Sequence, residues 1–203
     1  MADLSNYSKI VVFGSSDTYG HGLPDCKDMP ALIPSKHAWP SLISQMSGIT
    51  VENLSKLGAS NREILLKILN TDLTNDALVI VCWTHVHRSF LLGSDNSIER
   101  LIPIAKNTKT DCFYRLYDLK NLAFNSLIEI SHANAILKNK GCRVYNFYTD
   151  NLLNPNDKYF PLEVNLVEID KRTHIIDFAE DKLHPGLKSH ASIANYIYGI
   201  LNE

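Results

Sequence analysis

The stretch Ile10-Val11-Val12-Phe13-Gly14-Ser15-Ser16-Asp17-Thr18 decides the fold. Its four apolar residues, mostly β-branched, predict a short strand that is buried on both faces. Glycine and small hydroxyl residues follow, so the chain turns before helix-compatible sequence resumes. Such a turn at the carboxyl edge of a parallel sheet exposes a side chain and gathers backbone N–H groups. It therefore suits either a nucleophilic serine or a bound anion.

Strands and helices alternate along the rest of the chain. We expect strands at 49–54, 77–83 and 143–148, and helices at 38–46, 61–69, 110–140 (long or broken) and 185–201. Residues 24–34 and 150–171 are expected to be loops. This order predicts an α/β fold in which a central parallel sheet, with 77–83 at its centre, is covered on both sides. The ligand site should lie beyond the carboxyl ends of the strands.

Length and composition predict one soluble domain over residues 1–203. With 45% hydrophobic and 21% charged residues, the chain is typical of a globular protein that buries roughly 70% of its unfolded surface. The net charge of -2 and the lack of a basic run argue against nucleic-acid binding. No export signal and no run of about 18 apolar residues is present, so we expect a cytoplasmic protein without membrane insertion.

Cysteines and histidines give little support for a metal. The four cysteines are scattered without metal-ligand spacing, and we expect reduced thiols: Cys26, Cys82, Cys112 and Cys142. His85 and His87 are two apart and would share one face of a strand. The carboxylate or third histidine that zinc usually requires is not nearby in the sequence. We therefore predict no metal and no cofactor.

The strongest chemical motif is Asp181-Lys182-Leu183-His184-Pro185, directly before the last predicted helix. An acid–base histidine needs a carboxylate on one ring nitrogen while the other nitrogen faces the nucleophile, and this spacing supplies both groups from one loop. Alone, the motif would favour a helix cap. Together with the serine turn, it favours nucleophilic catalysis. Asp177 is an alternative orienting carboxylate, and Ser15 and Ser16 could instead be simple turn hydroxyls.

These motifs resemble the SGNH, or GDSL, hydrolases over nearly the whole chain. The segment 11–23 looks like the family's first block, 38–42 like its first helix, 51–60 like its second block and 181–185 like its last. The resemblance implies a flavodoxin-like three-layer α/β/α sandwich with Ser16 as nucleophile, His184 as general base and Asp181 as its orienting carboxylate. It places backbone donors of an oxyanion hole at Ser16 and Gly58.

Two positions depart from the family pattern. The usual Gly-Asp-Ser is Gly14-Ser15-Ser16, so the aspartate before the nucleophile is absent. The third block, usually Gly-x-Asn-Asp, is Trp83-Thr84-His85-Val86. His85 falls where the family's asparagine donates to the oxyanion, and an imidazole can donate one N–H in its place.

The leading interpretation is a serine esterase that acts on a small-molecule or carbohydrate ester, such as a sugar O-acetyl ester. The alternatives are a noncatalytic carbohydrate-binding or structural module on the same fold, and a flavodoxin-like FMN-binding protein whose phosphate lies at the Gly14–Thr18 turn. His21, His37 and Arg88 either line the mouth of the site or are simply exposed. His190 is expected to be a surface or packing residue.

Overall fold

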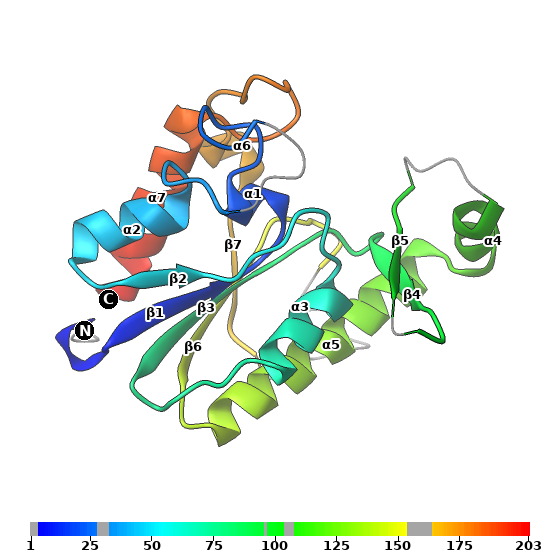
Figure 1. Ribbon diagram of the computed structural model, residues 1–203, viewed down its shortest axis with the longest axis horizontal. Helices are drawn as coiled ribbons and strands as arrows, with labels where there is room; N and C mark the ends of the chain where they lie inside the picture. The colour runs from blue at the N-terminus through cyan, green and yellow to red at the C-terminus, as the bar shows by residue number, and fades with distance from the viewer. Residues whose placement is uncertain (1–3, 28–32, 96, 104–107, 154–163) are drawn as a thin grey trace.

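A five-stranded parallel sheet forms the centre of the molecule (Figure 1). The computed structural model describes residues 4–27, 33–95, 97–103, 108–153 and 164–203. In the order of the sheet, the strands are β2 (Val51–Asn53), β1 (Lys9–Phe13), β3 (Ala77–Trp83), β6 (Arg143–Tyr148) and β7 (Leu166–Glu168). The central position predicted for 77–83 is confirmed, and every residue of β3 is buried.

Two pairs of helices cover the two faces of the sheet. On one face lie α2 (Trp39–Ser47) and α7 (Leu187–Leu201), and on the other lie α3 (Asn61–Leu69) and α5 (Leu119–Asn139). Alternate residues of β1 divide between the two cores. Ile10 and Val12 pack toward α2 and α7, whereas Val11 and Phe13 pack toward α3 and α5. The predicted three-layer α/β/α sandwich is therefore confirmed.

Local capping signals set the helix ends. Gly48 ends α2 with a φ of 72°, in the left-handed region that glycine adopts without strain. Ser60 and Glu63 form a reciprocal capping box at the start of α3. The predicted helix over 110–140 is broken into α4 (Thr108–Leu116) and α5. The break occurs because the Asp118 side chain accepts from the N–H of Asn121 and starts a new helix.

Several short elements were not predicted. They are the turn η1 (Leu4–Asn6), α1 (Ser16–Tyr19), the antiparallel hairpin of β4 (Ser89–Leu92) and β5 (Ile98–Leu101), the edge strand β7 and α6 (Lys171–His174). The structure thus corrects the loop expected at 150–171, although 154–163 lie outside the described residues. The same holds for 28–32 in the loop expected at 24–34.

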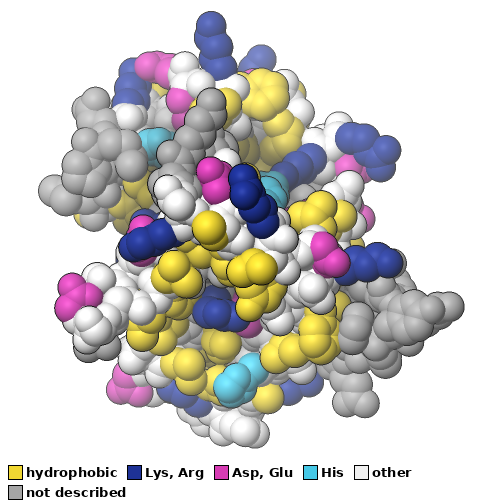
Figure 2. All heavy atoms as spheres, turned by 90° about the vertical axis from the view of Figure 1, so that its right-hand side faces the viewer, with side chains coloured by type: hydrophobic (Ala, Val, Ile, Leu, Met, Phe, Trp, Pro, Cys, Tyr) yellow, Lys and Arg dark blue, Asp and Glu magenta, His cyan; other side chains and the backbone are white. Residues whose placement is uncertain are grey.

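The β4–β5 hairpin and α4 project from the sandwich on the right of Figure 1. Apolar side chains gather on this side of the molecule (Figure 2). Exposed members of this region are Leu91, Leu92, Leu116, Tyr117 and Leu119. Within the described ranges, no helix combines the length and apolar character that crossing a membrane requires.

Candidate active site

The turn after β1 places Ser16 at the first residue of α1, where a backbone N–H has no partner within the helix. The turn requires glycine at position 14. Any other residue would place its Cβ 2.4 Å from the Thr18 hydroxyl, which is too close. Ser16 is only 4% exposed. Among the described residues, neither its N–H nor its hydroxyl makes a hydrogen bond. Both groups are thus available to a ligand that reaches the turn.

The loop after β2 lies against the serine turn. The N–H of Lys56 donates to the carbonyl of Gly14 at 3.1 Å, which joins the two loops through their backbones. Gly58 has a φ of 67°, a left-handed conformation that disfavours any side chain. Its N–H also makes no hydrogen bond to any part of the chain that the structure describes. The N–H of Gly58 is therefore available to donate to a ligand.

The loop before α7 brings Asp181 and His184 together. His184 Nδ1 lies 2.6 Å from Asp181 Oδ2, and Asp181 Oδ1 accepts from the backbone N–H groups of Leu183 and His184 at 2.9 and 3.0 Å. Burial alone would raise the pKa of the Asp181 carboxyl. The two backbone hydrogen bonds and the His184 ring outweigh burial and lower the pKa of Asp181 to about 2. The carboxylate stays ionised and fixes one nitrogen of the imidazole.

His21, in the loop after α1, completes what we name the Asp181 cluster: His21, Asp181 and His184. Its ring meets the His184 ring edge to face, with centroids 4.9 Å apart and planes at 83°. Burial, and then the neighbouring His184, lower the pKa of His21. One candidate ligand atom from each member lies within 4.8 Å of the others. The sequence left open whether His21 lines the mouth of the site or is simply exposed.

Two further residues have structural roles. Asp177 caps α7, since its carboxylate accepts from the N–H groups of Ser189 at 2.8 Å and Lys188 at 3.1 Å. These bonds occupy the carboxylate that the sequence offers as an alternative orienting group. His190 is fully buried, and its Nδ1 accepts the N–H of Trp39 at 3.1 Å. Burial lowers the pKa of His190 to about 4, so it is a neutral packing residue.

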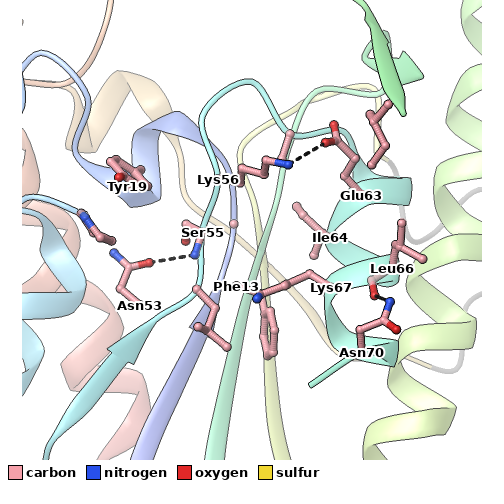
Figure 3. Close-up of a pocket in the computed structure, with 15 residues that line it drawn as sticks. Phe13, Tyr19, Asn53, Ser55, Lys56, Glu63, Ile64, Leu66, Lys67 and Asn70 are labelled. Carbon is pink, nitrogen blue, oxygen red and sulfur yellow. Dashed lines mark hydrogen bonds and ion pairs between the residues drawn. The ribbon is translucent and has the colours of Figure 1, made fainter. Parts of the chain in front are cut away.

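A cavity of about 510 Å³ opens between the serine turn, the loop after β2 and α3 (Figure 3). Gly14 and Ala59 connect its wall to the two loops that carry Ser16 and Gly58, while Ile64 and Lys67 extend it along α3. Ser16 and His184 are not among its lining residues. The structure also forms no hydrogen bond between the Ser16 hydroxyl and His184 within the described ranges.

Comparison with known proteins gives structural matches alone. No protein-family model and no curated protein matches this sequence. Phospholipase A1 from Streptomyces albidoflavus NA297 superposes with a TM-score of 0.55 at 13% identity, over 95% of this chain and 99% of that one. For a GDSL-like lipase from Bacteroides thetaiotaomicron VPI-5482, the TM-score is 0.51 at 12% identity. The match covers 96% of this chain and 88% of the lipase. This chain has the fold of the SGNH hydrolases.

A third solved structure with the SGNH fold is larger than this chain. The acetyl xylan esterase Est2A from the rumen bacterium Butyrivibrio proteoclasticus matches with a TM-score of 0.58 at 14% identity, over 97% of this chain and 64% of Est2A. Lipases, phospholipases and esterases thus share the fold. At identities of 12–14%, these matches show that the chain shares their fold. They do not show that it acts on the same substrates.

The third block of the SGNH pattern has an unexpected neighbour. His85 Nδ1 lies 3.7 Å from Asp150 Oδ2, and the His85 ring stacks on that of His87 with centroids 5.0 Å apart. We name His85, His87 and Asp150 the Asp150 cluster. Burial would raise the pKa of Asp150, but His85 and the backbone N–H groups of Leu152 and Val86 lower it to about 2. From the sequence we expected no carboxylate near the two histidines. This expectation was wrong, because folding brings Asp150 next to His85.

Proposed function

We propose that this protein is a serine esterase with Ser16 as nucleophile, His184 as general base and Asp181 as the carboxylate that orients it. The observation that carries the proposal is the 2.6 Å contact between His184 Nδ1 and Asp181 Oδ2, in a loop whose backbone also holds the carboxylate. This contact places the ring proton on Nδ1 and leaves the Nε2 lone pair to accept a proton. The SGNH fold, shared with lipases and esterases, supports the same reaction class.

The reaction follows from these roles. Ser16 Oγ attacks the ester carbonyl carbon as His184 Nε2 takes the hydroxyl proton, which gives a tetrahedral oxyanion. The C–O bond to the alcohol then breaks, and the alcohol leaves with the proton from His184. Water, activated by the same ring, releases the acid from the acyl-enzyme. Hydrogen bonds between nucleophile and base are often long in an unliganded enzyme and shorten when substrate binds.

Three donors are candidates for the oxyanion hole. The N–H groups of Ser16 and Gly58 are unused within the described chain and belong to two loops joined by the bond from Lys56 to Gly14. We propose His85 as the third donor, in place of the asparagine of the family pattern. Donors held in place before the reaction stabilise the developing charge without having to reorganise.

The cavity beside Gly14 supports a short acyl ester of a sugar as substrate. It combines apolar side chains, including Phe13 and Leu54, with polar side chains from Asn53 and Asn70. Sugar rings have both apolar faces and hydroxyl groups, so a mixed wall suits them better than a purely apolar one. Est2A, which shares the fold, is an acetyl xylan esterase. We expect acetylated sugars to be hydrolysed faster than esters of long fatty acids.

Covalent labelling tests the proposal directly. A fluorophosphonate should add once to the wild-type protein, as read by intact mass, because only an activated serine attacks it at neutral pH. Ser16→Ala should abolish both labelling and the hydrolysis of p-nitrophenyl acetate, and should leave the thermal midpoint nearly unchanged. Ser15→Ala is the matched control and should retain both activities. Labelling that follows Ser15 would move the nucleophile by one residue.

The alternative functions predict different results in the same experiment. A noncatalytic carbohydrate-binding module would resist the probe yet retain sugar ligands, and the altered residue at His85 keeps this alternative open. A flavodoxin-like protein would be purified with a yellow flavin. Wild-type protein that is folded, colourless and unlabelled at high probe concentration would reject the esterase proposal in favour of the module.

A further inference from the structure

The pairing of β3 with β6 brings His85, His87 and Asp150 to one edge of the sheet. Trp83, the last residue of β3, pairs with Tyr148, the last residue of β6, and the two strands are parallel. The segments that follow these residues therefore emerge side by side. His85 and His87 come from the first segment and Asp150 from the second. The two histidines and the carboxylate are 63 to 65 positions apart in the sequence.

The distances within the Asp150 cluster fit a shared metal ion. The two imidazole rings are stacked, with planes 15° apart and centroids 5.0 Å apart, so one ring must turn for a nitrogen of each to point at a shared ion. Candidate ligand atoms of all three residues lie within 4.8 Å of one another, and the His85 Nδ1 to Asp150 Oδ2 distance is 3.7 Å. Ligands at about 2.0–2.2 Å from zinc are separated by roughly 3.4 Å in a tetrahedron, so metal binding requires side-chain rotations that bring the ligand atoms closer together.

The surroundings hold these groups as a metal site requires. Asp150 is 5% exposed, and its carboxylate accepts from the N–H groups of Val86 at 2.8 Å and Leu152 at 3.0 Å. The hydroxyl of Tyr114 donates to the carbonyl of His87 and fixes the backbone there. Such outer contacts orient ligands and strengthen metal binding.

The three residues line a cavity of about 480 Å³. Glu168 and Asp170 add negative charge to the same cavity, and Lys171 and Arg172 add an equal positive charge. Neither Ser16 nor any residue of the Asp181 cluster lines it. The cavity can admit a metal ion together with a water molecule or a small anion as a further ligand.

We propose that His85, His87 and Asp150 bind a divalent first-row transition metal, best represented by Zn²⁺, with an open position toward the cavity. Two imidazoles and one carboxylate match the ligand set that zinc accepts, whereas Mg²⁺ and Ca²⁺ prefer oxygen ligands throughout. The proposal does not rest on the esterase function, because metal binding is measured without any substrate.

Isothermal titration of ZnCl₂ into tag-free, chelator-treated full-length protein tests the site. The wild type should bind Zn²⁺ at the Asp150 cluster, and His87→Ala should weaken this binding by at least about 100-fold because one of three ligands is lost. His21→Ala is the matched control. It removes a histidine from the Asp181 cluster, whose ligand atoms are equally close, and should change the affinity less than about threefold.

The possible results separate the two clusters. No binding by the wild type up to about 1 mM Zn²⁺ would overturn the proposal, since that is weaker than any useful site. Loss of binding in His21→Ala with full binding in His87→Ala would also overturn it. If His87→Ala folds poorly, His87→Gln replaces it, with circular dichroism as the folding control. The visible absorption of bound Co²⁺ should then appear in the wild type and vanish in His87→Gln.

Discussion

The Asp181 cluster and the Asp150 cluster each contain two imidazoles and one carboxylate, yet the chain assembles them in different ways. Asp181 and His184 belong to one short loop, and their side chains meet at 2.6 Å. Asp150 and His85 come from the ends of two different strands and remain 3.7 Å apart. In the first cluster the rings meet edge to face, whereas in the second they stack. The tight local pair suits proton transfer, and the looser stacked pair leaves room for an ion.

Exchanging each carboxylate for its amide should separate the clusters most strongly. Asp181→Asn should lower kcat by roughly 1,000- to 10,000-fold with little loss of stability, because the amide no longer holds His184 with its proton on Nδ1. Asp150→Asn should instead cost about 1–3 kcal/mol of stability, because a buried carboxylate that accepts two backbone N–H groups is lost. Ester kinetics and thermal unfolding on both variants measure the difference.

Similar kinetic losses in the two variants would contradict this division. The exposed His132, on α5, provides the control. His132→Ala should behave as the wild type in both measurements.

His85 connects the two clusters, since we propose it as an oxyanion donor and as a metal ligand. In chelator-treated protein, His85→Ala should lower kcat by roughly 100- to 1,000-fold with little change in KM, as expected when a transition-state donor is removed. His85→Asn restores the donor of the family pattern and should recover part of the loss. A variant that is destabilised but fully active per folded molecule would remove His85 from the oxyanion hole.

Neither cluster's carboxylate should account for loss of stability in mild acid. The pKa values of Asp150 and Asp181 are about 2, so the stability they provide is lost only as the pH falls below about 4. His190 is different, because its folded-state pKa of about 4 lies below the value near 6.5 expected after unfolding. The unfolded chain therefore binds a proton that the folded chain excludes, and roughly 3 kcal/mol is lost as the pH falls from 6.5 to 4.

Urea unfolding at several pH values measures the contribution of His190. His190→Gln should flatten the profile between pH 6.5 and 4, since glutamine does not titrate and its amide oxygen can accept the Trp39 N–H. A variant with the wild-type slope would assign the acid sensitivity to another group.

The smallest expected effect concerns the backbone at Gly58. Gly58→Ala and Gly48→Ala both place a methyl group on a residue with a positive φ. There is room for the methyl group in each case. Arg100 is 3.6 Å from the new Cβ at position 58, and nothing lies within 4 Å of the new Cβ at position 48. Each variant should lose about 1–2 kcal/mol of stability from backbone strain. Only Gly58→Ala should also lower kcat, because it shifts a proposed oxyanion N–H. Equal kcat values would separate Gly58 from the reaction.

The sequence predicted those features that residues close together in the chain determine. The predicted strand at 143–148 and the helix at 61–69 match β6 and α3, because burial periodicity and a capping box define them locally. The β4–β5 hairpin was missed because only one residue in each strand is buried, so neither strand shows apolar alternation. Asp150 was missed because its proximity to His85 depends on strand pairing. The sequence predicts a parallel sheet, but it does not predict that the strands at 77–83 and 143–148 are neighbours in that sheet.

The ends of the loop that carries Asp181 and His184 meet, with the Gly186 N–H bonded to the Asp177 carbonyl at 2.9 Å and Phe178 bridged to Pro185. Closing so short a loop costs little chain entropy. Bringing His85 to Asp150 closes a loop of more than sixty residues, which costs more entropy and requires β3 to pair with β6 first. During refolding, the carboxylate and imidazole of the first cluster should therefore meet early, and the second cluster should form only when the central sheet has assembled. The time at which Zn²⁺ binds during refolding would then measure when the native sheet forms.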